Sequence, residues 1–189
     1  RTPMTAILGF TENMLETELP TEERVKTIQT IRRSGEHLLG VVNDILDLSK
    51  IESGNLLVER KACSPCQIIA EVIDSLRESA EAKALQITYE YAGAMPQFVL
   101  TDPGYLTKIL TNVISNAIKF TEVGVVGLVV ELQNKDDEAA LVFNVSDTGV
   151  GINEERQSKI FKRCKSVDSS DAGEIKSAGL GLVISKSFA

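Results

Sequence analysis

The segment NVISNAIKFT, residues 112–121, combines an amphipathic helical pattern with an unusual set of polar side chains. Asn112, Asn116 and Lys119 are spaced by four and three residues, so a helix places all three on one face beside its apolar stripe. The triplet TDP at 101–103 supplies a cap and an N-terminal proline for this helix. Two amides and an ammonium on one face can hold a hydrated magnesium ion and phosphate oxygens, although such side chains are often only solvated.

A second polar motif follows a predicted β-hairpin. Its strands are predicted at Val125–Leu132 and Ala139–Val145, and the second strand runs directly into the turn DTGVG, which begins at Asp147. A carboxylate at this strand end can accept a hydrogen bond from an adenine amino group, while Gly149 and Gly151 let the backbone turn beside the ring. Alone, D-x-G-x-G is also compatible with an ordinary turn or an incomplete calcium loop. Its position after the Asn-bearing helix makes it specific.

A third motif is the glycine pair Gly179 and Gly181, which opens a predicted helix at Leu180–Phe188. Backbone N–H groups at a helix N-terminus form a ready site for phosphate oxygens. The pair is not a dinucleotide fingerprint, because no strand runs directly into it. The polar segment Asn153–Ser177 is longer than most loops of a compact domain, and loops of this length usually have a function. We expect it to close over a nucleotide as a lid.

Residues 1–53 are predicted to form a helical hairpin. One helix runs from about Thr2 to Glu18, and a second begins near Thr21, a candidate N-cap, and ends at Ser53. Apolar and small residues repeat along the second helix at alternating spacings of three and four, widened by two leucines: Ile28, Ile31, Gly35, Leu38, Leu39, Val42, Ile45, Leu46 and Ser49. This stripe predicts a homodimer whose hairpins form a four-helix bundle. The alternative is that the second domain covers the stripe within one chain.

Residues 54–189 alternate short strands with helices. Strands are predicted at Leu56–Cys63 and Leu85–Tyr91, with a helix at Pro65–Ala80 between them. Together with the hairpin of strands, this order predicts an α/β sandwich in which helices cover one face of a mixed sheet. The chain as a whole is therefore of the α+β class, with a helical domain followed by a sandwich domain.

The bulk composition restricts the function classes. The 189 residues carry 20 basic and 27 acidic side chains, a net charge of −7 that does not favour nucleic-acid binding. No run approaches the roughly 20 apolar residues of a membrane span, so no membrane contact is expected from this segment. Three cysteines do not make a disulfide framework, which fits a cytoplasmic setting. Cys63 and Cys66 form a C-x-x-C, but Cys164 and His37 are distant in sequence, so packing is favoured over a zinc or redox site.

Taken together, these motifs resemble those of sensor histidine kinases of two-component systems, over essentially the whole chain. The matching segments are residues 112–121 for the N box, 147–151 for the first glycine box, 160–161 for part of the F box, 179–182 for the second glycine box and 1–4 for the end of the phosphoacceptor motif His-Glu-x-Arg-Thr-Pro. The resemblance implies a dimerisation and phosphoacceptor hairpin followed by an ATP-binding domain of the GHKL (Bergerat) type.

The resemblance also implies a role for each matched residue. Asn112 would hold Mg²⁺, Asn116 and Lys119 would contact the phosphates of ATP, and Asp147 would recognise adenine. The glycines that would shape the pocket and the lid hinges are Gly149, Gly151, Gly179 and Gly181. The γ-phosphoryl group would pass to a histidine and then to an aspartate on a response-regulator receiver domain. Thr2 falls where many family members position the water that dephosphorylates the regulator.

Several residues depart from the family pattern. The motif's spacing places the phosphoacceptor histidine just upstream of Arg1, and His37 on the second helix does not replace it. Residues 164–166 stand where an aromatic pair and an arginine are common, and 177–178 stand where Gly-Thr often occurs. One alternative is therefore a degenerate ATP-binding and dimerisation module that signals without catalysis. An ATPase of the gyrase and chaperone group is disfavoured, because Asn112 stands where those enzymes carry a glutamate. The sequence leaves open whether the parent protein has a membrane anchor.

Overall fold

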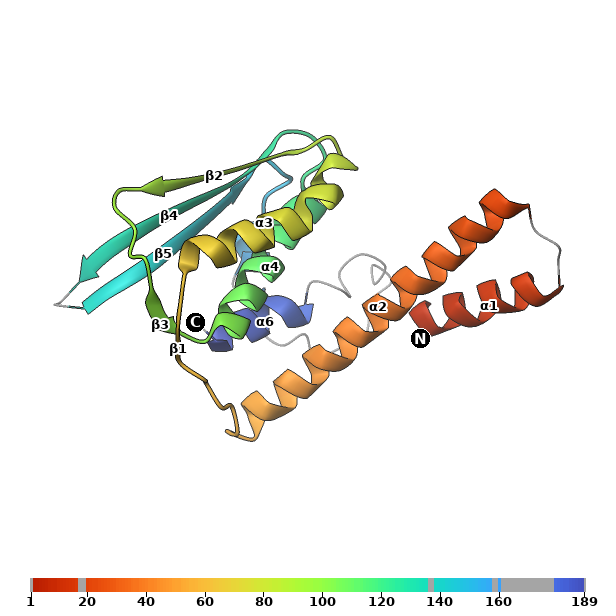
Figure 1. Ribbon diagram of the computed structural model, residues 1–189, viewed down its shortest axis with the longest axis horizontal. Helices are drawn as coiled ribbons and strands as arrows, with labels where there is room; N and C mark the ends of the chain where they lie inside the picture. Colours follow the sequence, from red (N-terminus) through yellow and green to blue (C-terminus); the bar gives the residue numbers. More distant parts are fainter. Residues whose placement is uncertain (1, 17–19, 136–137, 158–159, 161–178, 189) are drawn as a thin grey trace. The chain divides into compact units, whose positions relative to one another are not determined.

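A computed structural model describes residues 2–16, 20–135, 138–157, 160 and 179–188 of the chain. The chain divides into two compact units, Arg1–Leu56 and Leu57–Ala189 (Figure 1). The predicted domain boundary, between residues 53 and 54, lies just before this division.

The first unit is a pair of helices, α1 (Thr2–Glu16) and α2 (Thr21–Glu52), which pack against each other. The end of the predicted first helix, at residues 17 and 18, lies outside the described residues. The prediction of Thr21 as an N-cap is wrong, because Pro20 is the cap and its carbonyl already accepts the N–H of Arg24 at 3.0 Å. Thr21 is therefore the first helical residue.

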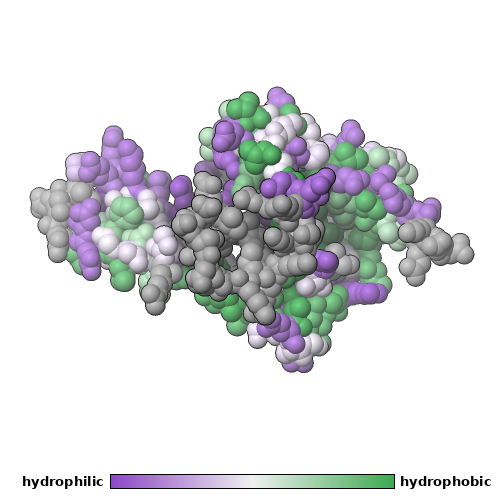
Figure 2. Space-filling model, turned by 180° about the vertical axis from the view of Figure 1, so that it is seen from behind, coloured by the Kyte–Doolittle hydropathy of each residue, from purple (hydrophilic) through white to green (hydrophobic). Residues whose placement is uncertain are grey.

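Much of the apolar stripe on α2 is exposed within this hairpin. Ile28, Val42 and Ile45 are 50%, 44% and 54% exposed, whereas Leu48 is buried. On α1, Met4 and Leu8 are also more than half exposed. Hydrophobic residues are accordingly visible among hydrophilic ones on the surface of the hairpin in Figure 2. The two helices of one chain thus leave a wide apolar face uncovered.

The second unit contains two sheets and the remaining helices. Its elements are β1 (Lys61–Cys63), α3 (Pro65–Glu81), β2 (Gln86–Ala92), β3 (Val99–Thr101), α4 (Pro103–Phe120), β4 (Val125–Lys135), β5 (Glu138–Asp147), α5 (Glu154–Gln157) and α6 (Gly179–Phe188). In the main sheet, β4 lies between β2, which is parallel to it, and β5, which is antiparallel. The mixed sheet and the β4–β5 hairpin confirm the prediction.

The small sheet, β1 with β3, differs from the prediction. The strand expected at Leu56–Cys63 is wrong in its first part, since only its last three residues pair, with the unpredicted strand β3. The reason lies in the preceding segment, where the backbone bonds to side chains and not to a neighbouring strand. Leu57 O accepts the hydroxyl of Tyr105 at 3.3 Å, and the N–H of Glu59 donates to Asp102 Oδ2 at 2.9 Å.

The core of the second unit lies between the main sheet and the helices α3 and α4. Alternate residues in the first half of β4 are buried, with Val126, Leu128 and Val130 only 1%, 2% and 0% exposed. They share a hydrophobic cluster with residues of the helices such as Val72 on α3 and Ile114 on α4. Figure 1 shows these helices on one side of the sheet. This is the sandwich expected from the sequence.

Cys63 and Cys66 are both free and half-buried, and they contact different neighbours. Cys63 packs against the core and its thiol donates to Val99 O at 3.8 Å. Burial, together with a hydrogen bond to Cys66, raises the pKa of Tyr91 to about 12. These contacts agree with the prediction that the C-x-x-C pair serves packing.

Candidate functional site

Helix α4 carries the three polar residues Asn112, Asn116 and Lys119. Its N-terminus is capped by Asp102, whose Oδ1 accepts the N–H groups of Gly104 and Tyr105 at 3.0 and 3.1 Å, so the predicted cap is confirmed. Asn112 and Asn116 are half-buried and Lys119 is exposed. All three therefore lie along the edge between the buried stripe of the helix and its surface.

Asn112 is in direct contact with the second glycine segment. Its side-chain Nδ2 donates to Gly181 O at 3.3 Å and to the hydroxyl of Ser185 at 3.4 Å, both on α6. A Cβ added at Gly181 would lie 3.2 Å from the Asn112 side chain, so the two helices approach closely here. Gly179 is the first residue of the same helix. Residues 69 positions apart are thus brought together.

The D-x-G-x-G turn contacts the other end of α4. Asp147 is the last residue of β5, and its Oδ1 accepts the N–H of Gly149 at 2.9 Å. A Cβ at Gly149 would lie only 2.5 Å from the carbonyl oxygen of Phe120, so only glycine fits there. Gly151 has a φ of +67°. The turn is therefore seated against the last residue of the helix that carries Lys119.

Thr148, inside that turn, has a structural role that the sequence reasoning missed. Its hydroxyl donates to Val123 O at 3.2 Å and accepts the N–H of Val125 at 3.1 Å. Gly124 is in close contact with this side chain, because a Cβ added at Gly124 would overlap the Thr148 hydroxyl. Gly124 also has a φ of +126°. The signal for this contact in the sequence was Gly124, which lies between a predicted helix and a predicted strand. The contact joins the turn to the α4–β4 connection.

Lys119 belongs to the last turn of α4 and directly precedes Phe120, the residue against which Gly149 is seated. Its ammonium is 5.2 Å from the centroid of the Phe120 ring, within the range of a cation–π contact. Two contacts therefore lie along α4: Asn112 with Gly181, and Phe120, which follows Lys119, with Gly149.

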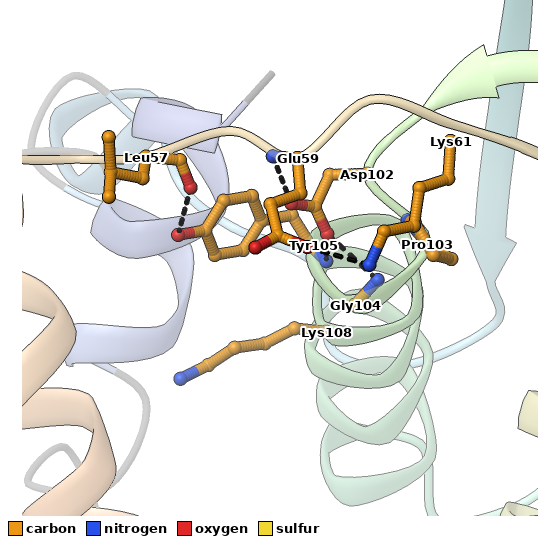
Figure 3. A pocket seen from close by; sticks show the side chains of 8 residues that line it. All are labelled: Leu57, Glu59, Lys61, Asp102, Pro103, Gly104, Tyr105 and Lys108. Carbon is orange, nitrogen blue, oxygen red and sulfur yellow. Dashed lines mark hydrogen bonds and ion pairs between the residues drawn. The ribbon is translucent and has the colours of Figure 1, made fainter.

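A cavity of about 480 Å³ lies at the opposite, N-terminal end of α4. No predicted site residue lines it; Figure 3 shows Asp102, Tyr105, Lys108 and Lys61 around it, together with Leu57 and Glu59. The hydrogen bond and charge of Glu59 raise the pKa of Lys61. The Tyr105 ring also stacks on Phe188 of α6, with centroids 4.1 Å apart. The N-terminal end of α4 thus contacts Leu57 and Glu59, which belong to the segment that follows the helical hairpin.

The remaining predicted residues are separate from this cluster or outside the described residues. Thr2 is exposed and is the first residue of α1. His37 is exposed on α2. Of the predicted lid, Asn153 and the short helix α5 are described, but 158–159 and 161–177 are not. The departures at 164–166 and 177–178 also fall outside the described part.

Comparison with known families places the two parts of the chain. Residues 1–54 match the His Kinase A (phospho-acceptor) domain, and residues 101–189 match the histidine kinase-, DNA gyrase B-, and HSP90-like ATPase domain. The chain belongs to the histidine kinase family. No helix in the described part of this histidine kinase core is long and apolar enough to cross a membrane.

Individual relatives agree with this assignment. The signal transduction histidine-protein kinase BarA of Escherichia coli K12 is 37% identical over 187 residues, which are 98% of this chain and 20% of BarA. The chain thus spans about a fifth of the curated relatives it matches first. Full-length ShkA in complex with AMPPNP has a TM-score of 0.69 at 27% identity, covering all of this chain and 38% of ShkA. ThkA in complex with the response regulator TrrA has a TM-score of 0.58 at 23% identity, over 87% of this chain and 47% of ThkA, which shows a shared fold.

Proposed function

We propose that this chain is the ATP-binding catalytic core of a two-component sensor histidine kinase. It transfers the γ-phosphoryl group of ATP to a histidine, from which the group passes to a response-regulator aspartate. The convergence of both glycine segments on α4 carries the proposal, with Gly181 at Asn112 and Gly149 at Phe120. The family match and the AMPPNP bound by ShkA support a nucleotide as the ligand.

In this proposal Asn112 holds Mg²⁺ through its Oδ1 atom. The amide nitrogen of the same side chain is engaged by Gly181 O and Ser185, which fixes the direction of the oxygen. An amide oxygen is a suitable hard ligand for Mg²⁺, which keeps several of its waters in such sites. The bound ion would neutralise charge on the β- and γ-phosphates.

Asn116 and Lys119 bind the phosphates. The Asn116 amide makes no hydrogen bond to other side chains or backbone in the described part of the chain, so it is available to a phosphate oxygen. Lys119, an ammonium at the exposed edge of α4, adds a point charge. Phosphoryl transfer depends mainly on such positioning and charge neutralisation.

Asp147 recognises the adenine amino group. Because its Oδ1 accepts the Gly149 N–H, the carboxylate is held in one orientation and Oδ2 can accept from the ring. The glycines that shape the pocket and the hinges of the lid are Gly149, Gly151, Gly179 and Gly181. Asp147→Ala is expected to abolish nucleotide binding, whereas Asn112→Ala should weaken only its magnesium-dependent part. Titration calorimetry with and without Mg²⁺ separates the two effects.

The kinase activity is tested with a chain lengthened upstream of Arg1 so that it carries the histidine of the phosphoacceptor motif. With labelled ATP and Mg²⁺ it should gain acid-labile, base-stable phosphate and pass it to a purified receiver domain. A chain that binds ATP but gains no such phosphate would instead be the degenerate signalling module. Steady hydrolysis without phosphoprotein would indicate an ATPase.

The hairpin serves as a homodimerisation domain in a four-helix bundle. Exposed apolar residues such as Val42 and Ile45 support this, because an uncovered face of this width needs a partner. Sedimentation at tens of micromolar should show a dimer, and Ile45→Asp should shift it to monomer. His37→Asp, at an exposed polar position of the same helix, is the control. A wild-type monomer would refute the bundle.

Thr2, exposed at the start of α1, orients the water that dephosphorylates the receiver domain, so Thr2→Ala in the lengthened chain should prolong the lifetime of phosphorylated receiver. An unchanged lifetime would remove this role.

The use of ATP and the free thiols of Cys63 and Cys66 support a cytoplasmic location for this segment. The partners of this segment are a second copy and a receiver domain, and the proposal includes no contact of this segment with nucleic acid or membrane.

A further inference from the structure

Helix α4 is not followed by the glycine that commonly comes after the last residue of a helix. Its last residue is followed by Thr121 in an extended conformation, with φ −97° and ψ 125°, so no left-handed residue folds the chain back over the final turn. The last carbonyl groups of a helix have no partner within it. Here Ala117 O is satisfied by the N–H and the hydroxyl of the buried Thr121, at 3.1 and 2.7 Å.

The next carbonyls are bound by a side chain from a distant part of the sequence. The ammonium of Lys83 donates to Ile118 O at 2.9 Å, to Lys119 O at 2.6 Å and to Thr121 O at 3.2 Å. An ammonium has three N–H donors, so all of them are used. Its charge lies at the negative end of the helix dipole, where a cation is stabilising. Lys83 therefore closes the end of α4.

The backbone of Lys83 is itself fixed by the way α3 ends. The N–H of Ala84 donates to Glu81 O at 2.9 Å, and that of Leu85 donates to Ala80 O at 3.0 Å. Ala84 has a φ of +53°, in the left-handed region. This pair of bonds is the Schellman pattern of a helix end. Lys83 thus extends from a rigid turn whose neighbour Leu85 is part of the core.

The three carbonyls that Lys83 binds flank Phe120, whose own carbonyl is the surface against which Gly149 is seated. The same turn of helix carries the Lys119 side chain. We propose that Lys83 is a positioning residue for the nucleotide site. It holds the last turn of α4, and with it Lys119 and the Gly149 turn, without touching the nucleotide. This inference rests on the proposed nucleotide binding by α4 and the D-x-G-x-G turn.

The test compares two lysines at opposite ends of α4 in the complete chain. Lys83→Met removes the ammonium but keeps much of the side-chain volume. Lys61→Met makes the same change at an exposed lysine whose ion pair, with Glu59 at 2.6 Å, lies beside the N-terminal end. Affinity for Mg²⁺-ATP is measured by calorimetry well below the melting transition, so that loss of folded protein does not contribute. Lys83→Met should weaken binding about tenfold, and Lys61→Met less than about twofold.

Conservative variants separate positioning from bulk stability. Lys83→Arg keeps the charge and the donors and should recover most of the affinity, while Lys83→Gln, the substitute if the Met variant folds poorly, should fall between. A variant that melts earlier but binds Mg²⁺-ATP with wild-type affinity would overturn the inference and leave the proposed function intact. Failure of the wild-type chain to bind Mg²⁺-ATP would overturn both.

Discussion

The two ends of α4 are bound by side chains of opposite charge. One is adjacent to the helix in sequence and the other is distant from it. At the N-terminal end, the carboxylate of Asp102 accepts the N–H groups of Gly104, Tyr105 and Glu59. At the C-terminal end, the ammonium of Lys83, 35 to 38 residues away in sequence, binds the carbonyls. Both arrangements suit the helix dipole, but they face different parts of the molecule.

The difference lies in what each end supports. The Asp102 end holds the segment that follows the hairpin, through Glu59 and through Leu57 at the Tyr105 hydroxyl. The Lys83 end holds the turn that begins at Asp147. We therefore expect changes at the first end to affect mainly the stability of the sandwich, and changes at the second to affect mainly its affinity for nucleotide.

The largest effect is expected from one added methyl group at the nucleotide end. Gly149→Ala places a Cβ 2.5 Å from Phe120 O, so the turn must move away from α4. Affinity for Mg²⁺-ATP should fall about a hundredfold, equivalent to about 3 kcal/mol. Gly104→Ala is the matched control at the other end, where the new Cβ would lie 3.3 Å from Asp102 Oδ1. Calorimetry should find its affinity unchanged, and equal losses in both variants would contradict the division between the ends.

A smaller effect, on stability, is expected at the other end. Asp102→Ala removes the acceptor of three N–H groups and should lower the free energy of unfolding by about 2 kcal/mol, measured by urea denaturation. Ser64→Ala is the control, because this cap of α3 accepts one N–H, from Gln67, and should cost about 1 kcal/mol or less. Affinity for Mg²⁺-ATP should change less than about threefold in either variant. A large loss of affinity in Asp102→Ala would show that this end also positions the nucleotide.

The same contrast explains how much of the molecule could be predicted from its sequence. Asp102 and its partners in the first turn are adjacent in the chain, so a local pattern reveals the cap. The face shared by Asn112, Asn116 and Lys119 follows from helical periodicity alone. The mixed sheet followed from the order of strands and helices. Such features depend on neighbours within about one helical turn or one hairpin.

What could not be predicted depends on contacts between distant residues. Lys83 is one of 20 basic residues, and no local pattern marks it as a helix cap. The strand expected before Lys61 fails because Asp102 and Tyr105 bind that backbone instead. At Lys83 and before Lys61, a hydrogen-bond partner distant in sequence determined the conformation. The error at Thr21 is of another kind, because Pro20 is not among the residue types that usually cap a helix.

The smallest effect should be a gain in stability at the turn that carries Lys83. Ala84 has a φ of +53°, which strains any residue with a Cβ, so Ala84→Gly should raise the free energy of unfolding by about 0.5 to 1 kcal/mol. Ala82→Gly, two residues earlier in right-handed helical conformation, should lower it by up to about 1 kcal/mol. Since Lys83 keeps its position, affinity for Mg²⁺-ATP should not change in Ala84→Gly. A stabilised variant that binds nucleotide more weakly would mean that the strained backbone at Ala84, and not only the Lys83 ammonium, holds the end of α4 in place.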